Sequence, residues 1–468
     1  EAVLLASEAE GFVQSLQSLE LTRIGDPQWQ RQHQYIEKLN MQAVLSVAKQ
    51  QDEFVPEFVV NHGKLETLMH DLLVTEVWKE KIFPLMISNS DFKPQVTFPI
   101  YLVLYHEATV LNLLETLSFH SDVVESLGEV ALDLIDYCHR KLVKLTQSGS
   151  MLEDGLLSVR SKTNSGLSGE NETGDSARSS LSELEQQRRS LEFELALKCV
   201  TVSSNLLTNS KSLSLSALTR ALNVHDYPLL FASLIELRPW KLRHPSTGQC
   251  YQYVDNGWQT VDQAEFNSGI VKLEGCVWLA LYEMLTNSEC QRKYEMTNYR
   301  KNFLLKLRSH LHETVLDQLS FLVPLRQGLE HMALLEPAPY KKELLLEQLP
   351  EVRAAILDKY QGKWPDIARI QMGTVFNISA ADFKSQAALW SDTYNLDVLE
   401  AMLAEPPKCG ACGAPAVKRC SRCQNEWYCR RECQVGHWTK HKPACDLMLV
   451  VPENKPNAGA IVEEVKSD

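Results

Sequence analysis

The densest group of residues that could do chemistry lies near the C-terminus. Seven of the chain's 12 cysteines lie between residues 409 and 445, together with two histidines. Their spacing is Cys409-x2-Cys412-x7-Cys420-x2-Cys423-x5-Cys429-x3-Cys433-x3-His437-x3-His441-x3-Cys445. A Cys-x2-Cys pair lets two thiolates converge on one tetrahedral ion, and donors four residues apart share one face of a helical turn. In a large acidic chain this pattern indicates metal ligands rather than disulfides.

The number of donors sets how many ions this segment can hold. Seven cysteines and two histidines are nine candidates for the eight positions of two tetrahedral shells. The segment is therefore expected to bind two zinc ions and to leave one donor unused. Spacing alone does not decide which four donors share an ion.

Two stretches of the segment resemble the MYND-type zinc finger family: Arg419-Cys-Ser-Arg-Cys-Gln-Asn-Glu-Trp-Tyr-Cys429 and Cys433-Gln-x2-His-Trp-x2-His-Lys-x2-Cys445. The family holds two zinc ions in a cross-braced arrangement. The resemblance implies that His437 is the spare donor and that each ion is structural, because four protein ligands leave no position for a reactive water. The implied sets are Cys409, Cys412, Cys429 and Cys433 for the first ion, and Cys420, Cys423, His441 and Cys445 for the second.

The same resemblance implies a protein ligand for the finger. MYND fingers generally bind short proline-containing peptides, and a Gln and a Trp of the last helix contribute to the groove. They match Gln434 and Trp438 here, although Trp438 could instead fill the small core of the finger. Nucleic acid is not expected as a partner. Residues 408–446 carry eight basic and three acidic side chains, and two zinc ions with seven thiolates reduce this excess to about +2.

The elements that must carry this finger are predicted to be mostly helical. Apolar residues follow helical spacing over 65–82, 99–117 and 123–142. The pair over 99–146 has nearly the length of one HEAT or armadillo repeat, which favours an armadillo/HEAT-like helical solenoid. One β-hairpin is expected near 249–261, where two β-rich runs flank Asp255-Asn256-Gly257 and Asn-Gly suits a type I′ turn. Its aromatic side chains are expected to pack against helices.

Composition divides the chain into segments. Residues 147–182 contain 15 Ser or Gly among 36 positions and no aromatic residue, which predicts a flexible loop. We therefore expect an N-terminal helical domain over 1–146, this loop, a second helical segment over 183–404, the zinc finger over 408–446 and a tail over 447–468. Pro406-Pro407 marks the entry to the finger.

Enzymatic and membrane functions are not expected. Gly63-Lys64 and Gly362-Lys363 fail as phosphate-binding loops because Phe58 and Leu357 occupy the position of the first glycine. MYND fingers also occur in lysine methyltransferases, but no companion motifs are found here. The N-terminal residues are acidic where a signal peptide is basic, and the longest apolar run, 98–105, is too short to span a bilayer. An intracellular protein with a net charge of −13 is expected.

Segments outside the finger carry a second resemblance. Residues 37–43, 91–101 and 133–141 are similar to ciliary MYND zinc-finger proteins. This implies a cytoplasmic, non-enzymatic factor for preassembly of axonemal dynein arms, with centriolar satellites or the apical region of ciliated cells as further locations. The implied partners are a leucine-rich-repeat dynein assembly factor, heat-shock chaperones and co-chaperones, and dynein chains as clients. A nuclear corepressor adaptor is the alternative, and a lysine methyltransferase is a weaker one.

Overall fold

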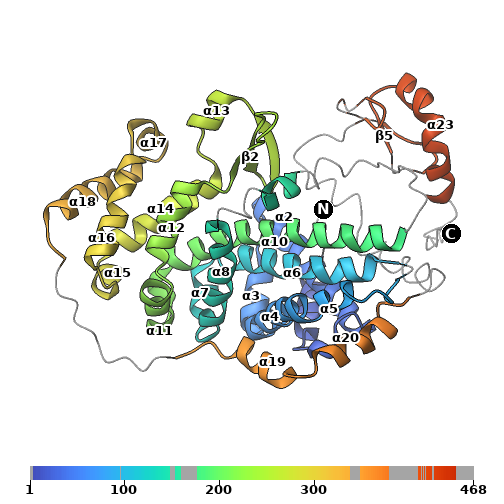
Figure 1. Cartoon of the computed structure of the whole chain (residues 1–468), viewed down its shortest axis with the longest axis horizontal. Helices are drawn as coiled ribbons and strands as arrows, with labels where there is room; N and C mark the ends of the chain where they lie inside the picture. The colour runs from blue at the N-terminus through green and yellow to red at the C-terminus, as the bar shows by residue number, and fades with distance from the viewer. Residues whose placement is uncertain are drawn as a thin grey trace, which may run out of the picture. The chain divides into compact units, whose positions relative to one another are not determined.

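The chain folds into two compact units, residues 1–380 and 381–468 (Figure 1). The computed structural model describes residues 4–94, 96–147, 153–159, 176–337, 348–378, 409–412, 414, 416, 418–423 and 426–448. The first unit is mostly helical and carries one small sheet, and the second contains the cysteine-rich segment. The predicted mostly helical class with one hairpin insertion and a C-terminal two-zinc finger is confirmed.

The N-terminal part of the first unit contains helices and no strand among its described residues. Helix α2 (Pro27–Lys49) begins at a recognisable signal: Asp26 accepts a hydrogen bond from the amide of Trp29, and Pro27 follows in the first turn. Gly128, with φ of 51°, divides the apolar stripe predicted over 123–142 into two helices. The elements are α1 (Ala6–Ser15), η1 (Leu21–Arg23), α2 (Pro27–Lys49), α3 (Phe54–Asn61), α4 (Leu65–Lys81), α5 (Phe83–Ile87), α6 (Phe98–Leu117), α7 (Ser121–Leu127) and α8 (Val130–Thr146).

The long helix α10 (Ser176–Thr208) joins the two predicted helical segments into one unit. It packs against α6, α8 and α14 (Lys272–Thr286), and Figure 1 shows it running through the middle of the unit. Cys199 of α10 and Cys138 of α8 are both fully buried in the core of this unit. The described residues within 4–146 and 183–378 thus belong to one compact unit, and residues 379–404 of the second predicted segment lie outside the described residues.

The predicted hairpin is part of a three-stranded antiparallel sheet. Strands β1 (Lys241–Arg243), β2 (Cys250–Val254) and β3 (Gly257–Val261) lie in sequence order. The turn residues are Asp255 and Asn256, with φ of 48° and 61°, so Gly257 begins the next strand instead of completing the turn. Tyr253 is buried against the indole of Trp258, and this indole packs against Phe193 of α10 with 6.1 Å between the ring centroids, as expected for hairpin aromatics that pack against helices.

The segment predicted as a flexible loop, 147–182, is partly helical. Residues 153–159 form a helix, and α10 already begins at Ser176. The side chain of Ser158 is buried, donates to Glu194 at 2.8 Å and accepts from the indole of Trp258 at 2.9 Å. Contacts with residues distant in sequence thus help to stabilise this helix. The rest of the predicted loop lies outside the described residues.

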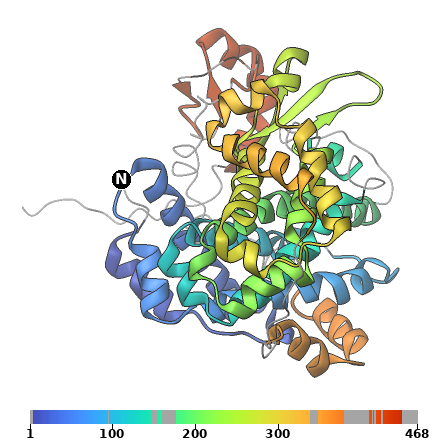
Figure 2. The same ribbon diagram turned by 90° about the vertical axis from the view of Figure 1, so that its left-hand side faces the viewer.

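The last part of the first unit returns to its beginning. Helices α19 (Val352–Tyr360) and α20 (Trp364–Gly373) contact α4 and α5, and both views show them against the N-terminal helices (Figure 1 and Figure 2). The indole of Trp78 donates to Gln371 at 2.8 Å. In a simple solenoid each repeat contacts only its neighbours, so this closure between segments almost 300 positions apart is an added feature.

The remaining elements of the first unit are η2 (Ser210–Ser212), α11 (Leu215–Thr219), the π-helical η3 (Arg220–Val224), α12 (Tyr227–Leu237), α13 (Gln263–Ser268), α15 (Ser288–Lys293), α16 (Asn298–Leu304), η4 (Leu305–Ser309), α17 (Glu313–Gln318), η5 (Ser320–Leu322) and α18 (Val323–Leu334). Among the described helices of the chain, none combines the length and the apolar surface that a membrane crossing needs. The second unit contains β4 (Lys418–Arg419), β5 (Trp427–Tyr428) and α23 (Arg431–Met448). The tail predicted over 447–468 begins within α23, and its residues from 449 onward lie outside the described residues.

Candidate metal centre

The cysteine-rich segment brings its donors together in two separate groups of four. Within each group the ligand atoms all lie within 4.8 Å of one another. The groups are Cys409, Cys412, Cys429 and Cys433, called site 1 below, and Cys420, Cys423, His441 and Cys445, called site 2. These are the two sets that the MYND resemblance implied. The two pairs of donors of site 1 alternate along the sequence with the two pairs of site 2, so each site connects segments that are separated by donors of the other.

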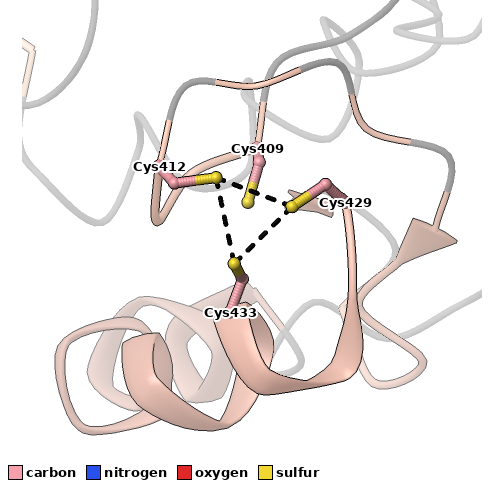
Figure 3. A group of neighbouring side chains, drawn as sticks. All are labelled: Cys409, Cys412, Cys429 and Cys433. Carbon is pink, nitrogen blue, oxygen red and sulfur yellow. Dashed lines mark hydrogen bonds between the residues drawn. The ribbon is translucent and has the colours of Figure 1, made fainter.

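Site 1 has the dimensions of a four-thiolate zinc site. The sulfur of Cys412 lies 3.5 Å from that of Cys429 and 3.8 Å from that of Cys433, and Cys429 lies 3.5 Å from Cys433 (Figure 3). Four sulfurs placed about 2.3 Å from a central ion at tetrahedral angles are separated by about 3.8 Å. The side chains of Figure 3 point toward one common centre, which is the geometry that zinc requires.

Site 2 combines three thiols with one imidazole. The sulfur of Cys423 lies 3.4 Å from Nε2 of His441. This distance also fits two donors of one tetrahedral zinc ion, for which zinc–sulfur and zinc–nitrogen bonds are about 2.3 and 2.0–2.1 Å. Three of the four donors, Cys420, His441 and Cys445, are buried. Neutral imidazole and thiolate are both ligands that zinc prefers, so the donor set fits the ion.

Helix α23 and the two short strands position these donors. Cys433, His441 and Cys445 lie on α23 at intervals of eight and four residues, so the helix delivers ligands to both sites. The step from Cys433 to His441 corresponds to an axial rise of about 12 Å. Strands β4 and β5 pair through Arg419 and Trp427, which places Cys420 directly after one strand and Cys429 directly after the other.

Backbone amides make the first cysteine of each Cys-x2-Cys pair acidic. Burial alone raises the pKa of Cys409, but amides that include those of Cys429 and Cys412 outweigh it and lower the pKa to about 6. Burial is likewise outweighed at Cys420, whose pKa is about 6 because of the amides of Cys423 and Arg422. Both sulfurs are therefore mainly thiolates at neutral pH, which is the form that binds a metal.

His437 is left outside both sites. Its Nδ1 is hydrogen-bonded to the hydroxyl of Tyr428 at 3.2 Å, and its ring lies nearly parallel to that of His441, with 6.2 Å between the ring centroids. The structure thus gives the spare histidine a packing role. Tyr428, which the sequence analysis did not single out, also packs edge-on against the ligand His441 and is buried. Its place directly before Cys429 was the only signal in the sequence.

The two residues implied in peptide binding lie on α23 outside the metal sites. Gln434 and Trp438 are both half-buried and one helical turn apart. Trp438 packs against the core of the finger, and its ring centroid lies 6.0 Å from that of His441. Part of its indole therefore supports the finger, while the remainder is exposed. The packing interpretation of Trp438 is thus confirmed for part of its indole, and its role in peptide binding stays a prediction.

Each metal site is closed. All four positions of a tetrahedral zinc ion are supplied by side chains in both sites, which leaves no position for an activated water. The chemistry that zinc supplies here is cross-linking of the chain. Among the described residues outside the finger, no group of three or more His, Cys, Asp or Glu side chains is arranged to hold a metal.

The comparisons with known proteins agree with this geometry. Residues 409–445 match the model of the MYND finger family. The chain is 31% identical over 457 residues to the zinc finger MYND domain-containing protein 10 homolog of Drosophila melanogaster, an alignment that covers 93% of this chain and 97% of the relative. It is 46% identical over 39 residues to ubiquitin C-terminal hydrolase 15 of Oryza sativa subsp. japonica, which covers 8% of this chain and 4% of that protein. No solved structure matches the chain.

The rice hydrolase shares no more than a segment as long as the finger, so its activity is not relevant to the helical unit. The Drosophila alignment, in contrast, spans nearly all of both chains and includes the helical unit as well as the finger. Since this likeness is not confined to the zinc ligands, the chain belongs to the family of zinc finger MYND domain-containing protein 10.

Proposed function

We propose that this chain is a non-enzymatic adaptor whose finger captures a peptide segment of a partner protein, and that it acts in the cytoplasm in the preassembly of axonemal dynein arms. The partners of this proposal are a leucine-rich-repeat assembly factor, heat-shock chaperones with their co-chaperones, and dynein chains as clients. The cytoplasmic location and these partners rest on the resemblance of residues 37–43, 91–101 and 133–141 to ciliary MYND proteins. Membership of the family supports the adaptor role.

The arrangement of Gln434 and Trp438 is the observation that carries the peptide-binding part. Neither side chain belongs to a ligand set, and both are half-buried on the same helix. An indole offers an apolar face, and a side-chain amide can both donate to and accept from a peptide backbone. A proline-containing peptide is already extended, so it loses little conformational entropy in a shallow groove.

The closed coordination of both metal sites supports a role without catalysis. Hydrolytic zinc needs one open position for water, and sites 1 and 2 supply four protein donors each. A lysine methyltransferase would instead need to bind S-adenosylmethionine. Isothermal titration calorimetry of the full chain with this cofactor is expected to show no binding, and measurable binding would contradict the proposal.

Substitution of Trp438 tests the adaptor function. Loss of a buried aromatic anchor commonly costs about 2–4 kcal/mol of binding, which is roughly thirty- to thousand-fold in affinity. Proximity labelling in multiciliated cells should therefore enrich dynein assembly factors and chaperones with the full chain, and Trp438→Ala should lose the partners held by the finger. Val435→Ala is the matched control because Val435 is 67% exposed on the same helix.

Native mass spectrometry separates a lost groove from a lost fold. Trp438→Ala is expected to retain two zinc ions, because Trp438 is not a ligand. If the variant loses zinc, Trp438 is a core residue and the groove is wrongly placed. If a folded variant retains every partner, capture occurs on the helical unit. Enrichment of nuclear corepressor components in place of ciliary factors would favour the alternative adaptor role.

A further inference from the structure

The two metal sites differ in how far their sulfur atoms are open to solvent. In site 1 Cys412 is exposed, Cys429 and Cys433 are half-buried, and only Cys409 is buried. In site 2 three donors are buried and only Cys423 is half-buried. Cys412 and Cys423 occupy equivalent places, each being the second cysteine of a Cys-x2-Cys pair. Solvent therefore reaches one of these two equivalent sulfurs more readily than the other.

Aromatic side chains account for part of the protection of site 2. The ring of Tyr428 packs edge-on against the imidazole of His441 with 6.1 Å between the ring centroids, and the indole of Trp438 lies 6.0 Å from the same imidazole. Tyr428 is almost fully buried, so the side of His441 that its ring covers is shielded from solvent. These contacts contribute to the burial of His441, which is 4% exposed.

The charge of the donors also differs between the sites. Four thiolates around Zn²⁺ give site 1 a net charge of −2, whereas three thiolates and a neutral imidazole give site 2 a net charge of −1. More negative charge on the sulfurs favours their reaction with electrophiles, and reactivity of cysteine follows thiolate character and exposure. Both properties make the cysteines of site 1 more reactive than those of site 2, and Cys412 is the most exposed cysteine of site 1.

We propose that Cys412 is an oxidation site for hydrogen peroxide and that its oxidation releases zinc from site 1 alone. The Cys412 sulfur attacks one peroxide oxygen, the O–O bond breaks, and a sulfenic acid forms while hydroxide leaves. The sulfur of Cys429, 3.5 Å away, then attacks the sulfenic sulfur and expels a second hydroxide. Two thiolates lose two electrons in total, and peroxide with two protons becomes two waters.

The disulfide removes two donors from site 1 and none from site 2. Cys409 and Cys433 cannot complete a tetrahedral shell by themselves, so the first ion leaves. His441 and Cys445 continue to fix the later turns of α23 to the Cys420–Cys423 pair. Reduction by a thiol restores both donors, and zinc can then bind again. Oxidation and reduction thus remove and restore the zinc ion of site 1, while site 2 keeps its ion.

The unmodified full chain, loaded with two zinc ions, provides the main test. It is titrated with hydrogen peroxide while a chromophoric chelator records free zinc, and the oxidised cysteines are located by peptide mass mapping. We expect one equivalent of zinc to be released first, together with a Cys412–Cys429 disulfide, while Cys420 and Cys445 stay reduced. The fully buried Cys138 and Cys199 of the helical unit are internal controls that should not react.

Two matched variants confirm the assignment to one sulfur. Cys412→Ser should abolish the fast phase of zinc release, whether or not site 1 still holds an ion, because the first target is absent. Cys423→Ser, at the equivalent position of site 2, should keep the fast phase. The proposal is overturned if site 2 cysteines are oxidised first, if both ions leave in one step, or if Cys412→Ser retains the fast phase.

Discussion

Four ionised side chains meet inside the helical unit, where α4, α6, α8 and α10 pack together. An ammonium of Lys79 lies 2.7 Å from Glu192, and that of Lys141 lies 2.7 Å from Glu107. The hydroxyl of Tyr137 also donates to Glu107 at 2.7 Å. The side chains of Lys79, Lys141 and Glu107 are at most 3% exposed. Burial of an ion costs several kcal/mol, so each charge persists only because its partners are present.

Removal of one charge from this cluster should destabilise the chain strongly. Glu107→Gln leaves Glu192 as the shared carboxylate of Lys79 and Lys141, so one buried positive charge is no longer balanced, which typically costs about 3–5 kcal/mol. Glu153→Gln is the matched control because Glu153 is 67% exposed in its pair with Arg189, and such pairs contribute about 0–1 kcal/mol. Urea denaturation followed by tryptophan fluorescence measures both. Equal losses in the two variants would contradict this account of the cluster.

Two histidines make the stability of the helical unit dependent on pH. Burial and the neighbouring His225 lower the pKa of His139 to about 4, and burial with His106 lowers the pKa of His33 well below its usual value. Unfolding returns both to about 6.5, so the unfolded chain binds protons that the folded chain does not. The contribution of these histidines to the free energy of unfolding is therefore complete above pH 6.5 and falls as the pH decreases toward 4.

The contribution of His139 to this pH dependence can be isolated. Each proton taken up on unfolding changes the free energy of unfolding by at most about 1.4 kcal/mol per pH unit. Denaturation at a series of pH values should show a shallower decline between pH 6.5 and 4 for His139→Gln. His331→Gln, at an exposed position of α18, should keep the slope of the unmodified chain. An unchanged slope in His139→Gln would mean that His139 does not titrate in this range.

At the scale of elements, closure of the helical unit depends on a close approach between η1 and the end of α20. Gly25, which follows η1, has a φ of 86°, and a Cβ at this position would lie 2.5 Å from Cγ1 of Val375. Phe376 is buried beside it and packs against Trp78 at a ring-centroid distance of 5.6 Å. Only glycine satisfies both the backbone conformation and the contact.

Alanine at Gly25 should loosen the return of α20. The left-handed backbone costs an L-residue about 1–2 kcal/mol, and the contact with Val375 adds to this. Gly63→Ala provides the control for the backbone cost alone, because Gly63 has a φ of 61° and a Cβ at its position would meet no neighbouring atom within 4 Å. Hydrogen exchange should accelerate in α20 for Gly25→Ala but not for Gly63→Ala. Equal exchange in the two variants would exclude the steric contribution.

At the scale of the whole molecule, the two units are stabilised by different means. The helical unit has a large apolar core that includes Trp78, Trp240 and Trp278. The described core of the finger consists mainly of zinc ligands, namely Cys409, Cys420 and Cys445, with Ala416 and Tyr428. So few apolar residues cannot compensate the entropy of ordering the segment without its metal ions.

Removal of zinc should therefore unfold the finger selectively. Structural zinc contributes roughly 10–16 kcal/mol of apparent binding free energy per site in finger peptides. Native mass spectrometry should find two zinc ions per chain. After treatment with a chelator, hydrogen exchange should become fast over residues 409–448, while the circular dichroism of the helical unit changes little. Loss of helical structure throughout the chain would show that the finger also stabilises the first unit.

Features that depend on short stretches of chain were predictable from the amino-acid sequence. Zinc donors are recognisable because few residue types bind the metal and their spacing is local, and the segment from Cys409 to Cys445 contains all eight. Helical periodicity located α4 and α6, and Asp255-Asn256-Gly257 located the hairpin, because each signal lies within the element that it specifies.

Features that depend on contacts between distant segments were not predictable in this way, because they arise when the chain folds. The helix at 153–159 is held by hydrogen bonds to Glu194 and Trp258, and α20 is held by a hydrogen bond to Trp78. Because these partners lie far away in the sequence, the local composition does not reveal them. Cys412 and Cys423 have the same sequence pattern, yet one is exposed and the other half-buried. Burial is a property of the assembled chain, because the atoms that exclude water from a side chain come from other elements.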